Sequence, residues 1–134
     1  MNRLLLPRAV YEALLEEARR SLPNECCGLL GGHGERATDI FPATNALASP
    51  TAYDIAVPEL VALFRRLRAE KLELVGIYHS HPQGDNAPSP RDVELAYYPQ
   101  SAYFIISPRP DAPRPVRAFR IAGQRAAELA IEVI

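Results

Sequence analysis

The sequence predicts a single α/β domain over residues 1–134, with a mostly antiparallel or mixed sheet flanked by helices. Its 134 residues, 48% of them hydrophobic, can bury one core but not two. Segments with helical and with strand-like periodicity are intermixed along the chain. Short turns join several of the strand-like segments, which favours antiparallel neighbours over a doubly wound parallel sheet.

The first element is an amphipathic helix that opens at Pro7. Proline suits the first position of a helix, where its missing N–H leaves no hydrogen bond unmade. Val10, Leu14, Ala18 and Leu22 then recur at four-residue spacing and form one apolar stripe. We expect this stripe to pack on the sheet.

A β-hairpin and a second helix are expected next. Residues 26–30 form a short apolar run that ends in the turn-like segment GGHGE, and the strand-like segment RATDIFPAT follows. The second helix opens at Pro58, with Leu60, Val61, Phe64 and Leu67 sharing its apolar face.

The second half of the chain returns to strands around one short helix. The segment LELVGIYHSH is strand-like, and SPRDVELAYY begins a helix with Ser89 as N-cap, Pro90 at N1 and Asp92 at N3. Pro99 limits the length of this helix. AYFIIS and VRAFRI are expected to pair around the loop PRPDAPRP, and LAIEVI is a plausible final strand.

Composition restricts the partners and the compartment. Fifteen basic and 16 acidic residues give a net charge of -1, which provides no global field for nucleic acid or an acidic membrane. No apolar run approaches the roughly 18 residues of a membrane span or forms the core of a signal peptide. The adjacent Cys26 and Cys27 cannot form a disulfide without strain. We therefore expect a cytoplasmic protein without nucleic-acid or membrane partners.

The segment 76–96 carries the strongest chemical signal. If residues 74–81 form a strand, His79 and His81 project from the same face while Ser80 points the other way. Paired imidazoles suit zinc, and Asp92 in the first turn of the next helix can supply a third ligand. Such a site leaves one tetrahedral position open for water.

A structural interpretation of the same residues stays open. Ser89 and Asp92 have the spacing of a capping box, which explains both without a metal. Histidines one residue apart at a strand end are also ordinary loop residues in many proteins. The combination of His-x-His-Pro with a spaced Ser-x-x-Asp favours the metal site over either simple interpretation.

These segments resemble the JAMM motif of the MPN+ metallopeptidases, also called the Mov34/MPN/PAD-1 family, in its short bacterial type. In that motif His-x-His-Pro, here HSHP, is followed after six residues, QGDNAP, by Ser-x-x-Asp, here SPRD. An upstream glutamate completes it, and Glu25 in PNECCGLLGG occupies that place. YDIAVPEL before the second helix and the order of elements extend the resemblance over most of the chain.

The resemblance implies a fold and a set of residue roles. The fold is an MPN domain of the cytidine-deaminase-like type, with a curved, mostly antiparallel mixed sheet flanked by helices. His79, His81 and Asp92 would hold Zn²⁺, Glu25 would act as general base and acid, and Ser89 would help to stabilise the oxyanion. This chemistry is self-consistent, because zinc activates water and a nearby carboxylate can shuttle its proton.

The implied activity is that of a zinc-dependent peptidase or isopeptidase acting on the C-terminal tail of a ubiquitin-like protein. For the short bacterial type, the implied reaction releases a carboxy-terminal amino acid, cysteine in particular, from a ubiquitin-like sulfur-carrier protein. Deubiquitinase-like isopeptidase cleavage is an alternative.

Two further alternatives come from other functional classes. One is a non-catalytic MPN scaffold, although such members lose metal ligands and this chain keeps all three. The other is a cysteine hydrolase using Cys26 or Cys27 with a histidine. The apolar residues that follow this pair favour two small core residues instead.

Overall fold

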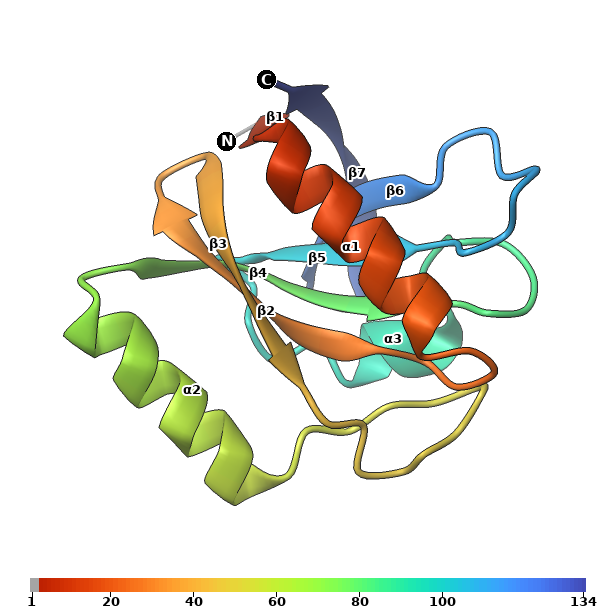
Figure 1. Ribbon diagram of the computed structural model, residues 1–134, viewed down its shortest axis with the longest axis horizontal. Helices are drawn as coiled ribbons and strands as arrows, with labels where there is room; N and C mark the ends of the chain where they lie inside the picture. Colours follow the sequence, from red (N-terminus) through yellow and green to blue (C-terminus); the bar gives the residue numbers. More distant parts are fainter. Residues whose placement is uncertain (1–2) are drawn as a thin grey trace.

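The computed structural model describes residues 3–134, which fold into a mixed sheet with helices around it (Figure 1). The elements in chain order are β1 (Arg3–Leu6), α1 (Arg8–Arg20), β2 (Cys27–His33), β3 (Arg36–Ala43), α2 (Val57–Ala69), β4 (Glu73–Ser80), α3 (Pro90–Glu94), β5 (Ala102–Ile106), β6 (Val116–Ala122) and β7 (Arg125–Val133). The α/β class and the expected order of helices and strands are confirmed.

The strands close into a barrel in the order β1-β3-β2-β4-β5-β6-β7. The β2–β3, β2–β4, β5–β6 and β6–β7 pairs are antiparallel, whereas β4–β5, β1–β7 and β1–β3 are parallel. Only one residue pair, Leu5 with Arg36, links β1 to β3. The sheet is therefore mixed, and its ring is closed at a narrow seam.

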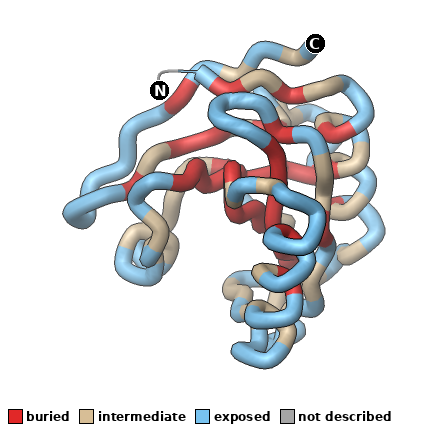
Figure 2. Tube along the Cα trace, turned by 90° about the vertical axis from the view of Figure 1, so that its left-hand side faces the viewer, coloured by how far each residue is buried: buried red, intermediate tan, exposed pale blue. Residues whose placement is uncertain are grey.

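Two apolar clusters cover the two faces of this sheet. One joins α1 to residues of all seven strands, including Leu14, Leu30, Tyr78 and Phe104. The other lies under α2 and includes Leu63, Leu67 and strand residues such as Ile77. Figure 2 shows buried residues following the strands inside, while the turns and outer helix faces are exposed. β4 is buried between the two clusters.

Three details differ from the sequence prediction. Pro7 is the N-cap of α1 rather than its first residue, and Leu22 lies beyond the helix with 48% of its surface exposed. On α2 the predicted Leu67 is buried and the predicted Leu60 and Phe64 pack on the same cluster, whereas Val61 is exposed and Leu63 takes its place on the buried face. β1 is not predicted by the sequence pattern, because four residues are too few to show periodicity and both of its partners are distant in sequence.

Among the described residues 3–134, no helix has the length and apolar character needed to cross a membrane.

Close packing between β2 and its neighbours depends on Gly28. A Cβ atom there would lie 2.5 Å from the carbonyl oxygen of Phe41 and 2.5 Å from ring atoms of Tyr78. The Tyr78 side chain is fully buried, so the ring cannot move away without disturbing the core.

Gly28→Ala should therefore lower the free energy of unfolding by about 3 kcal/mol, at the upper end of the cost of overpacking a core. Urea denaturation of the two proteins measures the difference. Ala127→Ser, at an exposed position of β7, is the control and should change stability by less than about 0.5 kcal/mol. A Gly28→Ala protein as stable as the parent would contradict this account of the packing.

Candidate functional site

Pairing of β2 with β4 assembles one side of the site. Cys27 lies opposite His79 in this antiparallel pair. Because side chains two residues apart share a face, Glu25 and His81 are expected beside them on that face. Ser80 points to the other face, where its hydroxyl oxygen accepts a hydrogen bond from the N–H of Cys26 at 2.8 Å. The expected alternation of the three residues 79–81 is confirmed.

The short helix α3 brings the carboxylate. Ser89 is its N-cap and forms a full capping box with Asp92: the Asp92 N–H donates to Ser89 Oγ, and the Ser89 N–H donates to Asp92 Oδ2. The same carboxylate lies against both histidines, with Oδ1 3.2 Å from His79 Nε2 and Oδ2 3.0 Å from His81 Nε2. The capping interpretation and the clustering with histidine are both correct.

Spacing within the cluster fits a tetrahedral metal ion. His79 Nε2 and His81 Nε2 are 3.1 Å apart, and the carboxylate oxygens lie at similar distances from them. Bonds of 2.0–2.1 Å from zinc to nitrogen place neighbouring ligand atoms of a tetrahedron about 3.3 Å apart. The two nitrogens and the carboxylate therefore already have nearly the separation that zinc requires.

The hydrogen bonds of His81 favour the same interpretation. Its Nδ1 donates to the carbonyl oxygen of Asp85 at 2.8 Å, since a carbonyl can only accept. Burial acts to lower the pKa of His81, but hydrogen bonds to Asp92 and to the Asp85 carbonyl outweigh it and raise the pKa, because a proton on Nε2 can be donated to Asp92 Oδ2. A metal cation at Nε2 would take the place of that proton, and a backbone partner at Nδ1 is the usual support of a metal-bound histidine.

Electrostatics around the cluster follow from burial and mutual contact. Burial lowers the pKa of His79, which keeps this imidazole neutral and able to bind a metal. Burial alone would raise the pKa of Asp92, but hydrogen bonds to His79 and His81 outweigh it and hold the pKa well below its usual range. The cluster thus combines an ionised carboxylate with a neutral imidazole.

Glu25 lies beside this cluster, outside the group of three. Only 5% of its surface is exposed, and burial raises its pKa to about 7, although the neighbouring His81 and Arg91 act in the opposite direction. Its backbone is fixed by the N–H donated to Ser49 O and by the Asn45 amide that donates to its carbonyl. A carboxylate with this pKa can both accept and return a proton near neutral pH.

Both cysteines are buried core residues rather than reactive thiols. Burial raises the pKa of Cys26 to about 11 and that of Cys27 to about 12. Thiols with such values carry almost no thiolate at neutral pH, so they are poor nucleophiles. These environments disfavour the cysteine-hydrolase alternative.

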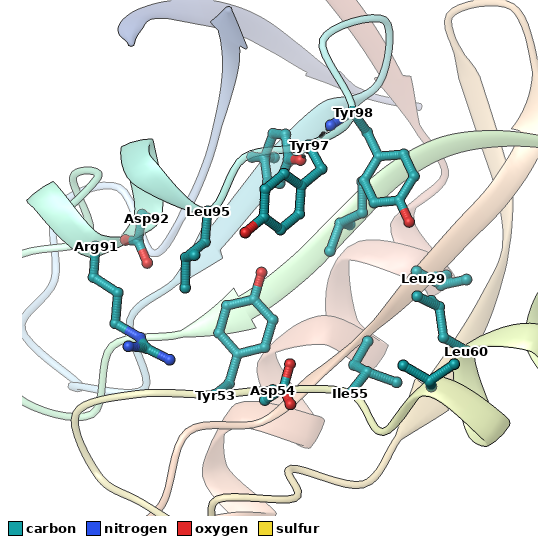
Figure 3. Close-up of a pocket in the computed structure, with 13 residues that line it drawn as sticks. Leu29, Tyr53, Asp54, Ile55, Leu60, Arg91, Asp92, Leu95, Tyr97 and Tyr98 are labelled. Atoms are coloured by element: carbon teal, nitrogen blue, oxygen red, sulfur yellow. Dashed lines mark hydrogen bonds between the residues drawn. The ribbon is translucent and has the colours of Figure 1, made fainter.

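A pocket of about 290 Å³ adjoins the cluster (Figure 3). Arg91 and Asp92 lie at one end of it, Leu60 and Tyr98 lie at the other, and Tyr53 stands between them. The remaining wall contains one carboxylate, Asp54, and is otherwise apolar and aromatic: Leu29, Ile55, Val57, Ile77, Leu95, Tyr97 and Tyr103. An elongated, mostly apolar ligand could therefore reach the cluster from the α2 side.

Two supporting residues are not predicted by the sequence pattern. The Tyr53 ring stacks on His79 with centroids 4.6 Å apart and covers that imidazole. The Asn86 amide donates to the carbonyls of Ile105 and Arg114, which fixes the loop between β4 and α3. Tyr53 belongs to the YDIAVPEL segment and Asn86 to QGDNAP, but each acts through a non-local contact that no local spacing reveals.

Comparison with known protein families assigns the chain to one of them. Residues 7–122 match the model of the prokaryotic homologs of the JAB domain. The chain belongs to this family. A JAB1/MPN-domain protein from Archaeoglobus fulgidus, AF2198, has the same fold, with a TM-score of 0.64 at 18% identity over 98% of this chain and 96% of that protein. The resemblance to JAMM/MPN proteins expected from the sequence is confirmed.

Two characterised relatives are similar over most of their length. The CysO-cysteine peptidase of Mycobacterium tuberculosis is 32% identical over 133 residues, which are 98% of this chain and 91% of the relative. The desampylase of Haloferax volcanii is 34% identical over 114 residues, which are 80% of this chain and 82% of the relative. The two similarities thus span most of this chain and most of each relative.

Burial of Glu25 predicts a pH-dependent stability in protein freed of metal with a chelator. Its pKa is about 7 in the folded state and 4.5 in the reference state, so the unfolded chain loses this proton first as the pH rises. The free energy of unfolding of the parent, compared with that of Glu25→Gln, therefore falls between about pH 4.5 and pH 7. Above about pH 7 the difference between the two proteins is constant. Urea denaturation should find the variant more stable by under about 1 kcal/mol at pH 5 and by about 3 kcal/mol at pH 8. A difference that does not vary with pH would refute the raised pKa.

Proposed function

We propose that this JAB-family domain is a zinc-dependent peptidase that cleaves at the C-terminal tail of a ubiquitin-like sulfur-carrier protein. The convergence of His79, His81 and Asp92 beside the buried carboxylate of Glu25 carries the proposal. One ligand atom from each of the three residues lies within 4.8 Å of the others. Three ligands leave a fourth position open, as catalytic zinc sites do.

Each side chain has a distinct role in the proposed hydrolysis. A zinc ion held by the cluster would lower the pKa of water to about 7 and polarise the scissile carbonyl. Glu25 takes one proton from the attacking water as the new C–O bond forms, and it delivers that proton to the amide nitrogen as the C–N bond breaks. The carbon end of the bond is then a carboxylic acid, and it passes the second water proton to the departing amine, so the products leave as a carboxylate and an ammonium group.

Ser89 can serve this reaction while capping α3. Its oxygen accepts the N–H of Asp92, which leaves the hydroxyl hydrogen free to be donated. A donor directed at the developing oxyanion contributes more in the transition state than in the ground state. Capping and catalysis therefore use opposite sides of one hydroxyl group.

The substrate class is supported by the pocket and by the relatives. The pocket is an elongated, mostly apolar depression that runs from α2 to the cluster, which suits an extended tail. One similar protein is named for cleaving CysO-cysteine and another is named a desampylase. Deubiquitinase-like isopeptide cleavage is the alternative, and it would use the same residues and the same hydrolytic reaction. The scaffold alternative is disfavoured because all three proposed metal ligands are present and lie together.

Metal analysis gives the first test. The protein should bind about one zinc per chain, and His79→Ala should lose the metal and the activity together. Asp92→Asn separates the two roles of that residue, because the amide retains one oxygen for the Ser89 N–H but loses the negative charge. We expect it to bind zinc at least about 10-fold more weakly by competition with a chelator. An Asp92→Asn protein with unchanged zinc affinity and turnover would limit Asp92 to capping.

Mass spectrometry of a carrier protein tests the reaction. A ubiquitin-like sulfur carrier ending in Gly-Gly-Cys should lose its last residue, and replacing the glycine before the scissile bond by leucine should abolish the loss if the peptidase is specific for a Gly-Gly tail. Glu25→Gln should retain zinc but lower kcat by at least about 10²-fold. Ser89→Ala should lower kcat by about 10²-fold. Efficient cleavage of unrelated unfolded proteins, without preference for a Gly-Gly tail, would overturn the assignment.

A further inference from the structure

Arg91 is the one arginine of the pocket wall, and its side chain makes no hydrogen bond or ion pair within residues 3–134. Another arginine beside the loop 81–88 does have protein partners. Arg117, for example, donates to both carboxylate oxygens of Glu128 and lies 3.7 Å from Asp85. This exposed guanidinium acts on Glu25 through its charge but forms no hydrogen bond or ion pair with a described residue, so its N–H groups are available to a ligand.

The position of Arg91 relates it to the reacting bond. It immediately precedes Asp92 in α3, and successive helical residues point about 100° apart, so its guanidinium flanks the cluster instead of entering it. Figure 3 shows the side chain extending from α3 toward the Tyr53 side of the pocket, at the end opposite Leu60. Its positive charge also acts on Glu25, the proposed proton carrier.

An exopeptidase of this kind has a charge to neutralise at that end. In a C-terminal residue, the carboxylate carbon is two bonds from the leaving nitrogen and about 2.5 Å away from it. The carboxylate therefore lies beside the buried Glu25 and the largely buried Asp92, where an ionised group needs a partner of opposite charge. A lysine joined by an isopeptide bond has no carboxylate so close to its leaving nitrogen.

We propose that Arg91 binds the free α-carboxylate of the residue being released, which makes the site selective for the last residue of a chain over an isopeptide-linked lysine. The tail before the scissile bond then occupies the apolar pocket toward Leu60 and Tyr98, and the released residue lies on the Arg91 side. A guanidinium matches the planar carboxylate with two parallel hydrogen bonds. The inference rests on the proposed peptidase function and specifies its substrate end.

The test compares two forms of one carrier. A ubiquitin-like sulfur carrier ending in Gly-Gly-Cys is prepared with a free C-terminal carboxylate and with a C-terminal carboxamide. The zinc-loaded parent should favour the acid by about 10- to 100-fold in kcat/KM, the scale of a hydrogen bond to a charged group. Arg91→Gln should bring this ratio close to 1. Arg8→Gln, an exposed arginine at the start of α1, is the matched control and should leave the ratio unchanged.

Binding gives a second readout that does not need turnover. In the Glu25→Gln background, calorimetry should find that the acid binds more tightly than the amide, and adding Arg91→Gln should remove the difference. An equal loss for acid and amide in Arg91→Gln would overturn the inference and assign Arg91 only an electrostatic effect on Glu25. A parent ratio near 1 would overturn it as well. Failure of the zinc-loaded parent to cleave either form would overturn the peptidase function itself.

Discussion

The Asp92 carboxylate joins the two parts of the site. One of its oxygens accepts the N–H of Ser89 and lies against His81, while the other lies against His79. It thereby ties the start of a five-residue helix to the end of a buried strand. A helix this short has little stability of its own, so its position depends on this cap and on the loop fixed by Asn86. The negative charge that holds α3 in place also completes the group of three residues that could hold a metal ion.

Local chemistry explains what could be read from the sequence. His79 and His81 share a face because strand side chains alternate, and this needs no knowledge of the partners. The capping box of α3 is likewise decided within four residues, so its start was predicted correctly. Glu25 was predicted as a site residue only through the resemblance to the JAMM motif, because no neighbouring residue in the sequence distinguishes it from an ordinary glutamate before a strand.

Contacts between residues far apart in the sequence explain most of the features that the sequence did not predict. The register that sets Cys27 opposite His79, and so carries Glu25 toward the cluster, is decided by strands about 50 residues apart. β1 acquires its identity only by closing the ring between β7 and β3. Glu25 likewise differs from the exposed acidic residues only in being buried by the folded chain. On α2, by contrast, Leu63 completes the i, i+3, i+4, i+7 pattern of Leu60, Phe64 and Leu67, so helical periodicity alone places it on the buried face and Val61 outside it.

Part of the pocket wall comes from loops, whereas the first histidine of the proposed metal site comes from a strand. Tyr53, Tyr97 and Tyr98 belong to segments outside the helices and strands, whereas His79 lies in the buried part of β4. Loops accept substitutions and insertions far more readily than buried strands do. Within this fold, preference for one protein tail over another can therefore diverge between lineages while the hydrolytic centre stays unchanged. The same separation offers a route for engineering selectivity by redesigning the loops around Tyr53 and Tyr97 alone.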